Sequence, residues 1–358
     1  MGMWRFAGLM EPVSPEHRVT LGEGDTPLVR SQRIGPAAGL KRLFFKLEGS
    51  NPTGSYKDRF ASVAVSSMLA SGKSRCVATS SGNGGAALAA YCARAAIACE
   101  IVIIETAVPG KLSQMLAYGA SLKRVRGFGV DPEITRKVFD RLRELDGGFD
   151  AALQITAYHF SPIGMTGVQS ISYELQEQAH EQGLALDHVF VPAGGGGLAL
   201  AVARGFELLC AADLEQRSPA VNVVQPEGND TIATPLREGR SHARAIQCTS
   251  AISGLQVPSV IDGDDLIAAS RASKGRGYTV SDEQVWQLQS RLAREEGVFC
   301  EPAAAVSLAG ALQAAERGEI ASDAMIVCLV TGSGFKDSAS VERMTRDSTC
   351  PLIEFDDL

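Results

Sequence analysis

The chain has 358 residues, 45% of them hydrophobic, which is enough for one large or two medium globular domains with buried cores. Its formal net charge is -7 and it has no long run of Lys and Arg, so it lacks the electrostatic basis for binding nucleic acid. No window approaches the roughly 20 apolar residues of a membrane span, and the first residues lack the apolar core of a signal peptide. We therefore expect a cytoplasmic protein that binds neither nucleic acid nor membranes.

The segment KLEGSNPTGSYKDR at 46–59 predicts a turn that opens a helix. Pro52, Thr53 and Gly54 favour a tight turn, and Thr53 or Ser55 is suited to capping the helix that follows. Lys57 would then lie in the first helical turn.

Strand-like and helix-like segments alternate after this point. The first series is RCVATS (75–80), GGAALAAYCARAA (84–96), CEIVIIE (99–105), GKLSQMLAYGA (110–120) and SLKRVRG (121–127). The second is HVFVPAGGGG (188–197), LALAVARGFELL (198–209), AVNVVQPEG (220–228) and AMIVCLVTGSG (324–334), with further helices expected at 284–297 and 303–318. This order predicts two α/β units, the first of them a parallel sheet with right-handed crossovers.

Glycine-rich segments follow three of the expected strands, namely TSSGNGG (79–85), PAGGGG (192–197) and TGSG (331–334). Backbone N–H groups at the start of a helix bind anions, and glycine lets a phosphate approach closely. None of the segments has the spacing of a P-loop or of a dinucleotide-binding loop. A single turn of this kind is explained equally well as a tight turn or as an anion site, whereas three of them favour a ligand site.

The eight cysteines form no C-x-x-C pair, and the five histidines are dispersed. Most cysteines lie in apolar runs, which is typical of buried free thiols in a reducing compartment. The sequence therefore predicts no metal site.

Taken together, these segments resemble the fold type II pyridoxal-phosphate enzymes, and among them the threonine synthases. The matching elements follow the family's order, and they are TLGEGDTPLV (20–29), the 46–59 segment, TSSGNGGAALAAYCAR (79–94), KLSQMLAYGA (111–120), GGGG (194–197), SDEQ with LAREEGVFCEPAAAVSLAG (281–310) and TGSGFKD (331–337). The resemblance implies an α/β fold of two doubly wound domains with the cofactor cleft between them. Residues 1–59 and 156–358 would form the large cofactor-binding domain, and 60–155 the small one.

The resemblance also implies cofactor roles for individual residues. Lys57 would form the Schiff base with pyridoxal 5'-phosphate and then act as general base. Asn83 would bind the phenolic oxygen of the ring, and Thr331 the pyridine nitrogen, where a neutral hydroxyl suits elimination and replacement better than transamination. The phosphate would be held by the backbone N–H groups of Gly194, Gly195, Gly196 and Gly197. Glu301 belongs to one of the family's elements, but it is interpreted equally well as a residue that interacts with the positive N-terminus of the helix that follows it.

On the substrate side the sequence departs from the family. Threonine synthases carry Thr or Ser directly after the cofactor asparagine, where this chain has Gly84. Alignment on Pro162 and Gly167 places Gly164 at a phosphate-gripping arginine of the family, and Tyr158 and His159 at an Asn-Ser pair. The backbone N–H groups of residues 81–84 should still bind the α-carboxylate of a small L-amino acid. The expected substrate-binding residues are Ser80, Ser81, Gly82, Gly84, Tyr158 and His159.

Three hypotheses about function follow. The first is a threonine synthase-like lyase or replacement enzyme with an altered substrate site, acting on a β- or γ-activated L-amino acid, with true threonine synthase as one case within it. The second is an ammonia-lyase similar to serine and threonine dehydratases. The third is a cofactor-binding protein without turnover. The resemblance implies a homodimer in each case.

Overall fold

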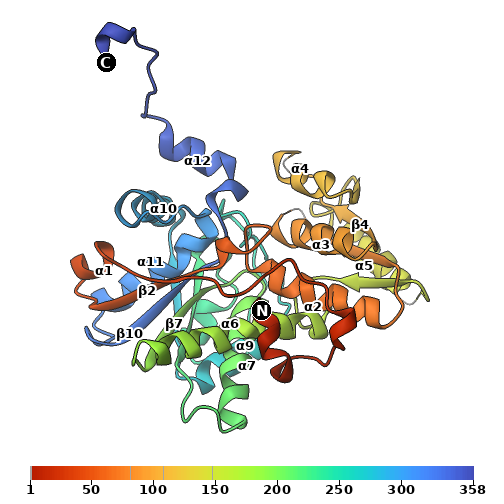
Figure 1. Ribbon diagram of the computed structural model, residues 1–358, viewed down its shortest axis with the longest axis horizontal. Coiled ribbons are helices and arrows are strands. Elements are labelled where there is room, and N and C mark those ends of the chain that lie inside the picture. Colours follow the sequence, from red (N-terminus) through yellow and green to blue (C-terminus); the bar gives the residue numbers. More distant parts are fainter. Residues whose placement is uncertain (1, 81, 108, 147) are drawn as a thin grey trace.

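The computed structural model describes residues 2–80, 82–107, 109–146 and 148–358, which build two sheets that lie side by side (Figure 1). The larger sheet has six strands in the order β1-β2-β10-β7-β8-β9, and only β1 runs antiparallel to its neighbour. These strands are β1 (Leu28–Arg30), β2 (Arg42–Leu47), β7 (Leu186–Pro192), β8 (Ala220–Pro226), β9 (Gly277–Val280) and β10 (Met325–Val330). Every residue of β10 is buried, which is typical of a central parallel strand covered on both faces.

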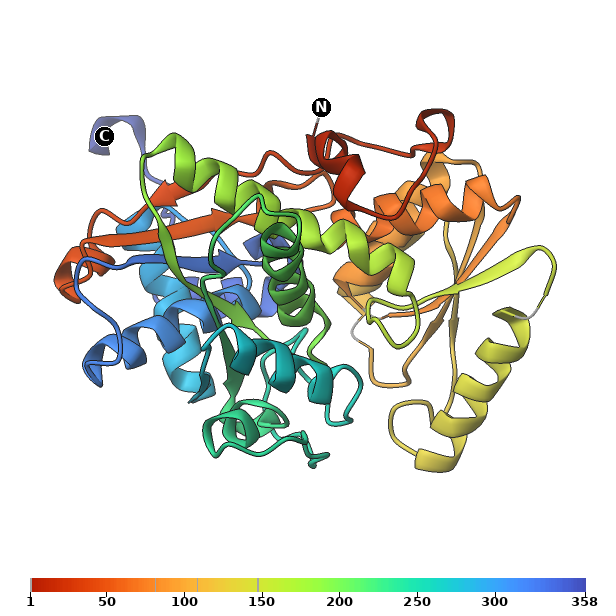
Figure 2. The same ribbon diagram turned by 90° about the horizontal axis from the view of Figure 1, so that it is seen from below.

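The smaller sheet has four strands, all parallel, in the order β5-β4-β3-β6. Its strands are β3 (Arg75–Thr79), β4 (Ala98–Ile103), β5 (Ser121–Arg124) and β6 (Ala151–Gln154). Helices α3 (Asn83–Arg94), α4 (Pro109–Ala117) and α5 (Pro132–Asp146) connect them. Figure 2 shows this sheet on one side of the molecule and the larger sheet on the other.

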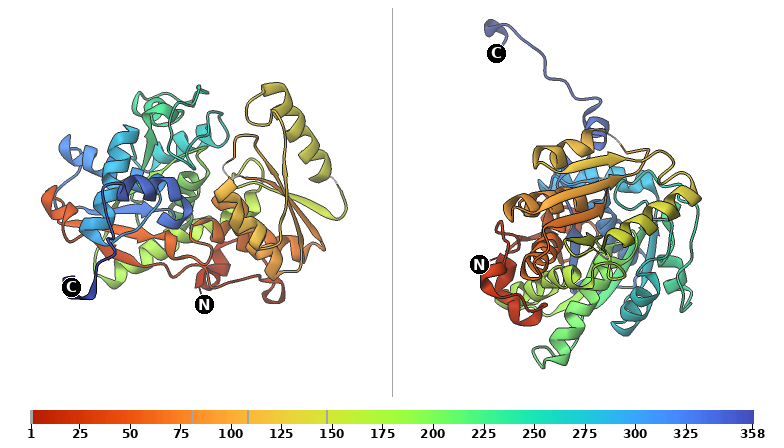
Figure 3. Two further views of the ribbon diagram at one scale, coloured as in Figure 1. Left: turned by 90° about the horizontal axis from the view of Figure 1, so that it is seen from above. Right: turned by 90° about the vertical axis from the view of Figure 1, so that its right-hand side faces the viewer.

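The remaining helices cover the larger sheet or join the two sheets. They are α1 (Ile34–Ala37), α2 (Lys57–Ala70), α6 (Pro162–Glu181), α7 (Gly197–Ala211), α8 (Ala233–Arg237), α9 (Gly263–Ala272), α10 (Asp282–Glu296), α11 (Pro302–Glu316) and α12 (Ser338–Thr345). Short 3₁₀ helices occur at Gly2–Leu9, Pro15–His17, Glu48–Ser50, Glu227–Asn229, Gly334–Lys336 and Phe355–Asp357. After α12 the chain leaves the body of the molecule as an extended tail (Figures 1 and 3).

The alternating α/β pattern expected from the sequence is confirmed in both sheets. Each expected strand and helix of the two series is present within a few residues of its expected bounds. The sequence did not reveal β1, β2, β6 and β9, the amphipathic α5, the 20-residue α6, or the shorter helices α1, α8, α9 and α12. The strands of the smaller sheet lie within 60–155 and those of the larger sheet outside it, so we keep this division as our proposal for the two domains.

Five of the eight cysteines are buried, as their apolar contexts indicate. Cys76, Cys92 and Cys99 come from β3, α3 and β4, and their sulfur atoms lie within 4.8 Å of one another inside the smaller unit. The sequence-based expectation that the chain has no metal site stays a prediction. Within the described residues, no helix combines the length and the apolar character needed to cross a membrane.

Helix α2 lies between the two sheets, where it packs against α6 on one side and α3 on the other. Its first turn is held by a fully buried ion cluster of Lys46, Glu48, Arg59 and Glu174. The Arg59 guanidinium donates two hydrogen bonds to Glu48 and two to Glu174, each at 2.8 Å. Lys46 Nζ lies 2.8 Å from Glu174 Oε2, so two positive charges meet two negative ones.

The positive charges of the cluster change the pKa of Glu174. Burial by itself raises the pKa of this carboxyl group, but Arg59 and Lys46 outweigh burial and hold the pKa well below its usual range. A buried ion cluster is costly to form, and removing one member leaves the others charged without partners.

We expect Arg59→Met to lower the free energy of unfolding by about 3–5 kcal/mol, because Glu48 and Glu174 lose their shared cation. The measurement is urea-induced unfolding followed by circular dichroism. Arg136→Met is the matched control, since Arg136 forms an exposed pair with Asp140, and its effect should stay within about 0.5 kcal/mol. Equal small effects of both substitutions would contradict this role of the cluster.

Candidate active site

One cavity of about 490 Å³ collects most of the residues singled out in the sequence. This volume is in the range of small-molecule sites. Helices α2, α3 and α7 each begin at a residue that lines it, respectively Lys57, Asn83 and Gly197. Because the N-terminus of a helix carries a partial positive charge, the three helices together favour an anionic ligand.

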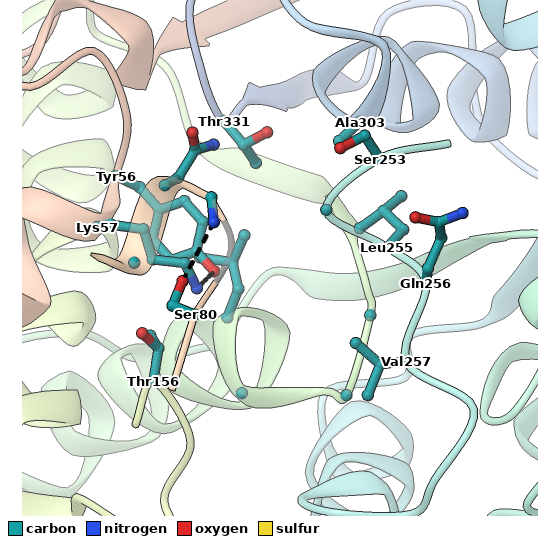
Figure 4. A pocket seen from close by; sticks show the side chains of 18 of the residues that line it. Tyr56, Lys57, Ser80, Thr156, Ser253, Leu255, Gln256, Val257, Ala303 and Thr331 are labelled. Carbon is teal, nitrogen blue, oxygen red and sulfur yellow. Dashed lines mark hydrogen bonds between the residues drawn. The ribbon is translucent and has the colours of Figure 1, made fainter. Parts of the chain in front are cut away.

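Lys57 is the first residue of α2, as the sequence predicts. Its backbone N–H donates to Ser55 Oγ at 3.4 Å, but the N-cap position is Tyr56 and α2 has no side-chain cap, so the expected cap by Thr53 or Ser55 is wrong. Thr53 does not cap: its N–H and hydroxyl both donate to the carboxylate of Asp58, at 3.1 and 2.7 Å. Figure 4 shows Lys57 and Tyr56 on the side of the cavity opposite Val257.

The chemistry of the Lys57 amine is set by its surroundings. Its Nζ donates to the hydroxyl of Tyr56 at 2.5 Å. Desolvation by the surrounding protein lowers the pKa of Lys57 to about 7, and the nearby Glu301 carboxylate only partly opposes this shift. A large share of this lysine is therefore a neutral amine at neutral pH, which is the form that attacks an aldehyde.

The four glycines after β7 form a backbone cradle in the cavity wall. Gly196 has φ +101°, a left-handed conformation that favours glycine, and it stands at the N-cap of α7. Among the described residues no acceptor binds the N–H groups of Gly194, Gly195, Gly196 and Gly197. A Cβ atom on Gly194 or Gly195 would lie 3.1 or 3.2 Å from the Val257 side chain. The cradle therefore fits a phosphate group held by backbone donors alone.

Asn83 and Thr331 both bind the carboxylate of Glu301. Asn83 Nδ2 donates to the two Glu301 oxygens at 3.1 and 3.0 Å, and Thr331 Oγ1 donates to Glu301 Oε1 at 3.4 Å. Glu301 occupies the N-cap position of α11 but makes no side-chain cap there. Its carboxylate is instead turned into the cavity, a role that the sequence left open.

The segment after β3 supplies the proposed carboxylate site. Ser80, Gly82 and Gly84 line the cavity, whereas Ser81 lies outside the described residues. Ser80 Oγ accepts a hydrogen bond from Gly82 N at 3.4 Å. A Cβ atom on Gly84 would lie 3.2 Å from Ser80 Oγ and 3.3 Å from Thr156 Oγ1. Glycine at this position thus keeps the space between the two hydroxyl groups open.

Tyr158 and His159 lie beside the cavity and are not among the described residues of its lining. Their backbone N–H groups donate to Asp262, at 2.8 and 3.1 Å. The Tyr158 ring lies under the guanidinium group of Arg204, 4.3 Å from the ring centroid. Thr156 lies in the lining instead, and no sequence motif points to it.

Gly164 belongs to the packing between helices and not to the cavity. A Cβ atom there would lie 2.6 Å from Phe60 Cε2 and 3.0 Å from Ala64 Cβ, both on α2. The position that aligns with the family's arginine is therefore a helix-packing residue in this chain. The described lining contains no arginine, and its basic side chains are Lys57 and Lys336. Lys336 belongs to the TGSGFKD segment, whose resemblance to the family implies no role for this lysine.

Comparison with protein families matches residues 19–332 to the family described as pyridoxal-phosphate dependent enzyme. The chain belongs to this family. Threonine synthase from Methanocaldococcus jannaschii is 32% identical over 350 residues, covering 97% of this chain and 84% of that protein. Threonine synthase from Mycobacterium leprae is 33% identical over 323 residues, covering 89% of this chain and 84% of that protein. The expected cofactor, pyridoxal 5'-phosphate, is thereby confirmed.

Solved structures of the same fold belong to several enzymes. Diaminopropionate ammonia lyase from Escherichia coli has a TM-score of 0.77 at 17% identity, covering 95% of each chain. Threonine deaminase isoform 2 from Solanum lycopersicum has a TM-score of 0.73 at 20% identity, covering 94% of this chain and 91% of that one. This pyridoxal-phosphate dependent enzyme therefore has the fold type II architecture expected from its sequence.

We expect Lys57→Ala to abolish covalent attachment of pyridoxal phosphate, because it removes the cavity amine whose pKa is lowered to about 7 and which is therefore largely neutral and able to attack the aldehyde. The measurement is borohydride reduction of the loaded protein followed by mass spectrometry of its peptides. Lys41→Ala, which removes an exposed lysine, is the control and should load as the parent protein does. A reduced cofactor adduct on the Lys57→Ala protein would sink the assignment.

The rate at which the apoprotein takes up the cofactor should rise with pH through about 7. The reason is that burial lowers the pKa of Lys57, and only the neutral amine attacks the aldehyde. Stopped-flow absorbance across this pH range measures the rate. A midpoint close to the ordinary lysine value of 10.5 would show that Lys57 is fully solvated instead.

Proposed function

We propose that the chain is a pyridoxal-phosphate dependent lyase or replacement enzyme acting on a small L-amino acid with a leaving group on its β or γ carbon. The observation that carries the proposal is the Lys57 amine, with its lowered pKa, opening into the same cavity as the glycine cradle. The similarity to threonine synthases over nearly the whole chain supports the same reaction class.

Each part of the cavity has a task in this proposal. The glycine cradle, Asn83 and Thr331 position the cofactor, which when bound supplies an electron sink for negative charge at the substrate's Cα. The 80–84 segment binds the α-carboxylate through backbone N–H groups. Lys57 Nζ takes the proton from Cα as general base, and its lowered pKa makes the neutral form available for this step.

The substrate side of the cavity supports a substrate different from that of the threonine synthases. Gly84 stands where that family carries a hydroxyl side chain, and the described lining offers no arginine for a phosphate group. Threonine synthase itself is the competing function, favoured by the curated relatives at 32% and 33% identity. An ammonia-lyase that releases a 2-oxo acid would use the same residues. The experiment below distinguishes it from a replacement enzyme.

We further propose that the enzyme is a cytoplasmic homodimer. The resemblance to threonine synthases supports the dimer, and the buried free cysteines suit a reducing compartment. Light scattering of the purified protein measures the mass in solution, and the mass of a single chain would contradict the dimer.

A panel of amino acids separates the reactions. The loaded enzyme is mixed with O-phosphohomoserine, O-phosphoserine, serine or threonine, and the cofactor spectrum, 2-oxo acid and amino-acid products are followed. We expect at least one β- or γ-activated amino acid to change the spectrum and to be consumed. Release of a 2-oxo acid without an added nucleophile identifies an ammonia-lyase, and rapid formation of threonine from O-phosphohomoserine would overturn the altered substrate site.

A further inference from the structure

Lys336 is a second lysine of the cavity, and the cofactor roles above leave it unused. It ends the 3₁₀ turn Gly334–Lys336 that follows β10. Its side chain passes over the turn before Lys57, since a Cβ atom on Gly54 would lie 3.1 Å from Lys336 Cε. Its Nζ donates to Gln114 Oε1 at 2.6 Å, and both residues line the cavity.

Gln114 reaches this place from α4 of the smaller unit. Its Nε2 donates to the carbonyl oxygen of Thr53 at 3.2 Å, in the same turn over which Lys336 passes. Two side chains from distant parts of the chain therefore meet beside Lys57. They can bind a ligand group between them, or simply fasten α4 to the turn.

The charges around Lys336 favour the first of these roles. Within the described residues no carboxylate lies at ion-pair distance from its ammonium group, and its hydrogen-bond acceptor is a neutral amide. Burial lowers the pKa of Lys336, and the more distant Glu301 and Asp58 carboxylates only partly oppose this. A buried cation is stabilised most by a direct hydrogen bond to an anion. A neutral amide such as Gln114 provides a hydrogen bond but no negative charge.

The other functional groups of an amino-acid substrate already have partners in the proposed site. Its amino group reacts at the cofactor, and its α-carboxylate lies at the 80–84 segment. Glu301, the acidic side chain of the described lining, is bonded to Asn83 and Thr331. What remains is the end of the substrate's side chain, and Lys336 is the remaining cation in the described lining that can meet it.

We propose that Lys336, together with Gln114, binds an anionic oxygen group at the end of the substrate's side chain, so that the enzyme selects amino acids carrying a phosphate or a carboxylate there. This inference rests on the proposed function. It assigns to a lysine from the C-terminal part of the chain the anion-binding task that the absence of an arginine from the described lining leaves open.

The test compares amino acids that carry an anionic group at the end of the side chain with neutral partners. The loaded enzyme is titrated with L-glutamate and L-glutamine, and with O-phospho-L-serine and L-serine, and the dissociation constant is read from the change in the cofactor spectrum. We expect the anionic member of at least one pair to bind about 10- to 100-fold more tightly, the range of a hydrogen bond to a charged group. The pair with the larger preference tells phosphate from carboxylate.

Two variants assign the preference to Lys336. Lys336→Met should abolish the difference within each pair and leave the neutral amino acid bound as before, whereas Lys336→Arg should keep the preference. Lys41→Met removes an exposed lysine and should behave as the parent protein. Lys336→Gln serves as a second neutral variant that retains hydrogen bonding, in case the methionine protein does not load the cofactor.

Other outcomes overturn the inference in distinct ways. Equal affinity of the parent enzyme for charged and neutral partners would contradict it directly. Equal weakening of both partners by Lys336→Met would show that Lys336 only fastens α4 to the turn. Absence of a spectral change with every amino acid would instead overturn the proposed function, because that result does not depend on the substrate's charge.

Discussion

The buried ion cluster around Arg59 is the interaction on which the position of the reactive amine depends. Arg59 lies half a helical turn after Lys57, and its guanidinium is held by Glu48 from the segment before the turn and Glu174 from α6. Because a charge removed from water must stay paired, the start of α2 has one stable position relative to both sheets. The Lys57 side chain is thereby fixed at the cavity wall.

The cavity beside Lys57 favours anionic ligands, although its described lining contains no arginine. Helices α2, α3 and α7 begin there, and the partial positive charge of each N-terminus attracts an anion without a charged side chain. Glu301 supplies the opposing charge beside Asn83 and Thr331. The same low-polarity surroundings that lower the pKa of Lys57 strengthen every other electrostatic contact in the cavity.

Residues whose task depends on local backbone geometry were predictable. The turn before Lys57, the glycines after β7 and the alternation of strands and helices are each written in neighbouring residues, because turn, cap and periodicity act over a few positions. Tyr158, His159 and Gly164 were harder to place. Whether they face the cavity depends on Asp262 and Phe60, which come from other parts of the chain.

The sequence by itself determined the fold class, the cofactor and the position of Lys57 at the start of a helix, since these rest on contiguous motifs. Only the tertiary structure decided which side chains complete the cavity. It brings Thr53, Gln114 and Lys336 together from three distant segments, and turns Glu301 away from its own helix toward Asn83. The spacing of residues along the chain does not predict these contacts, because they depend on how the two sheets pack against α2.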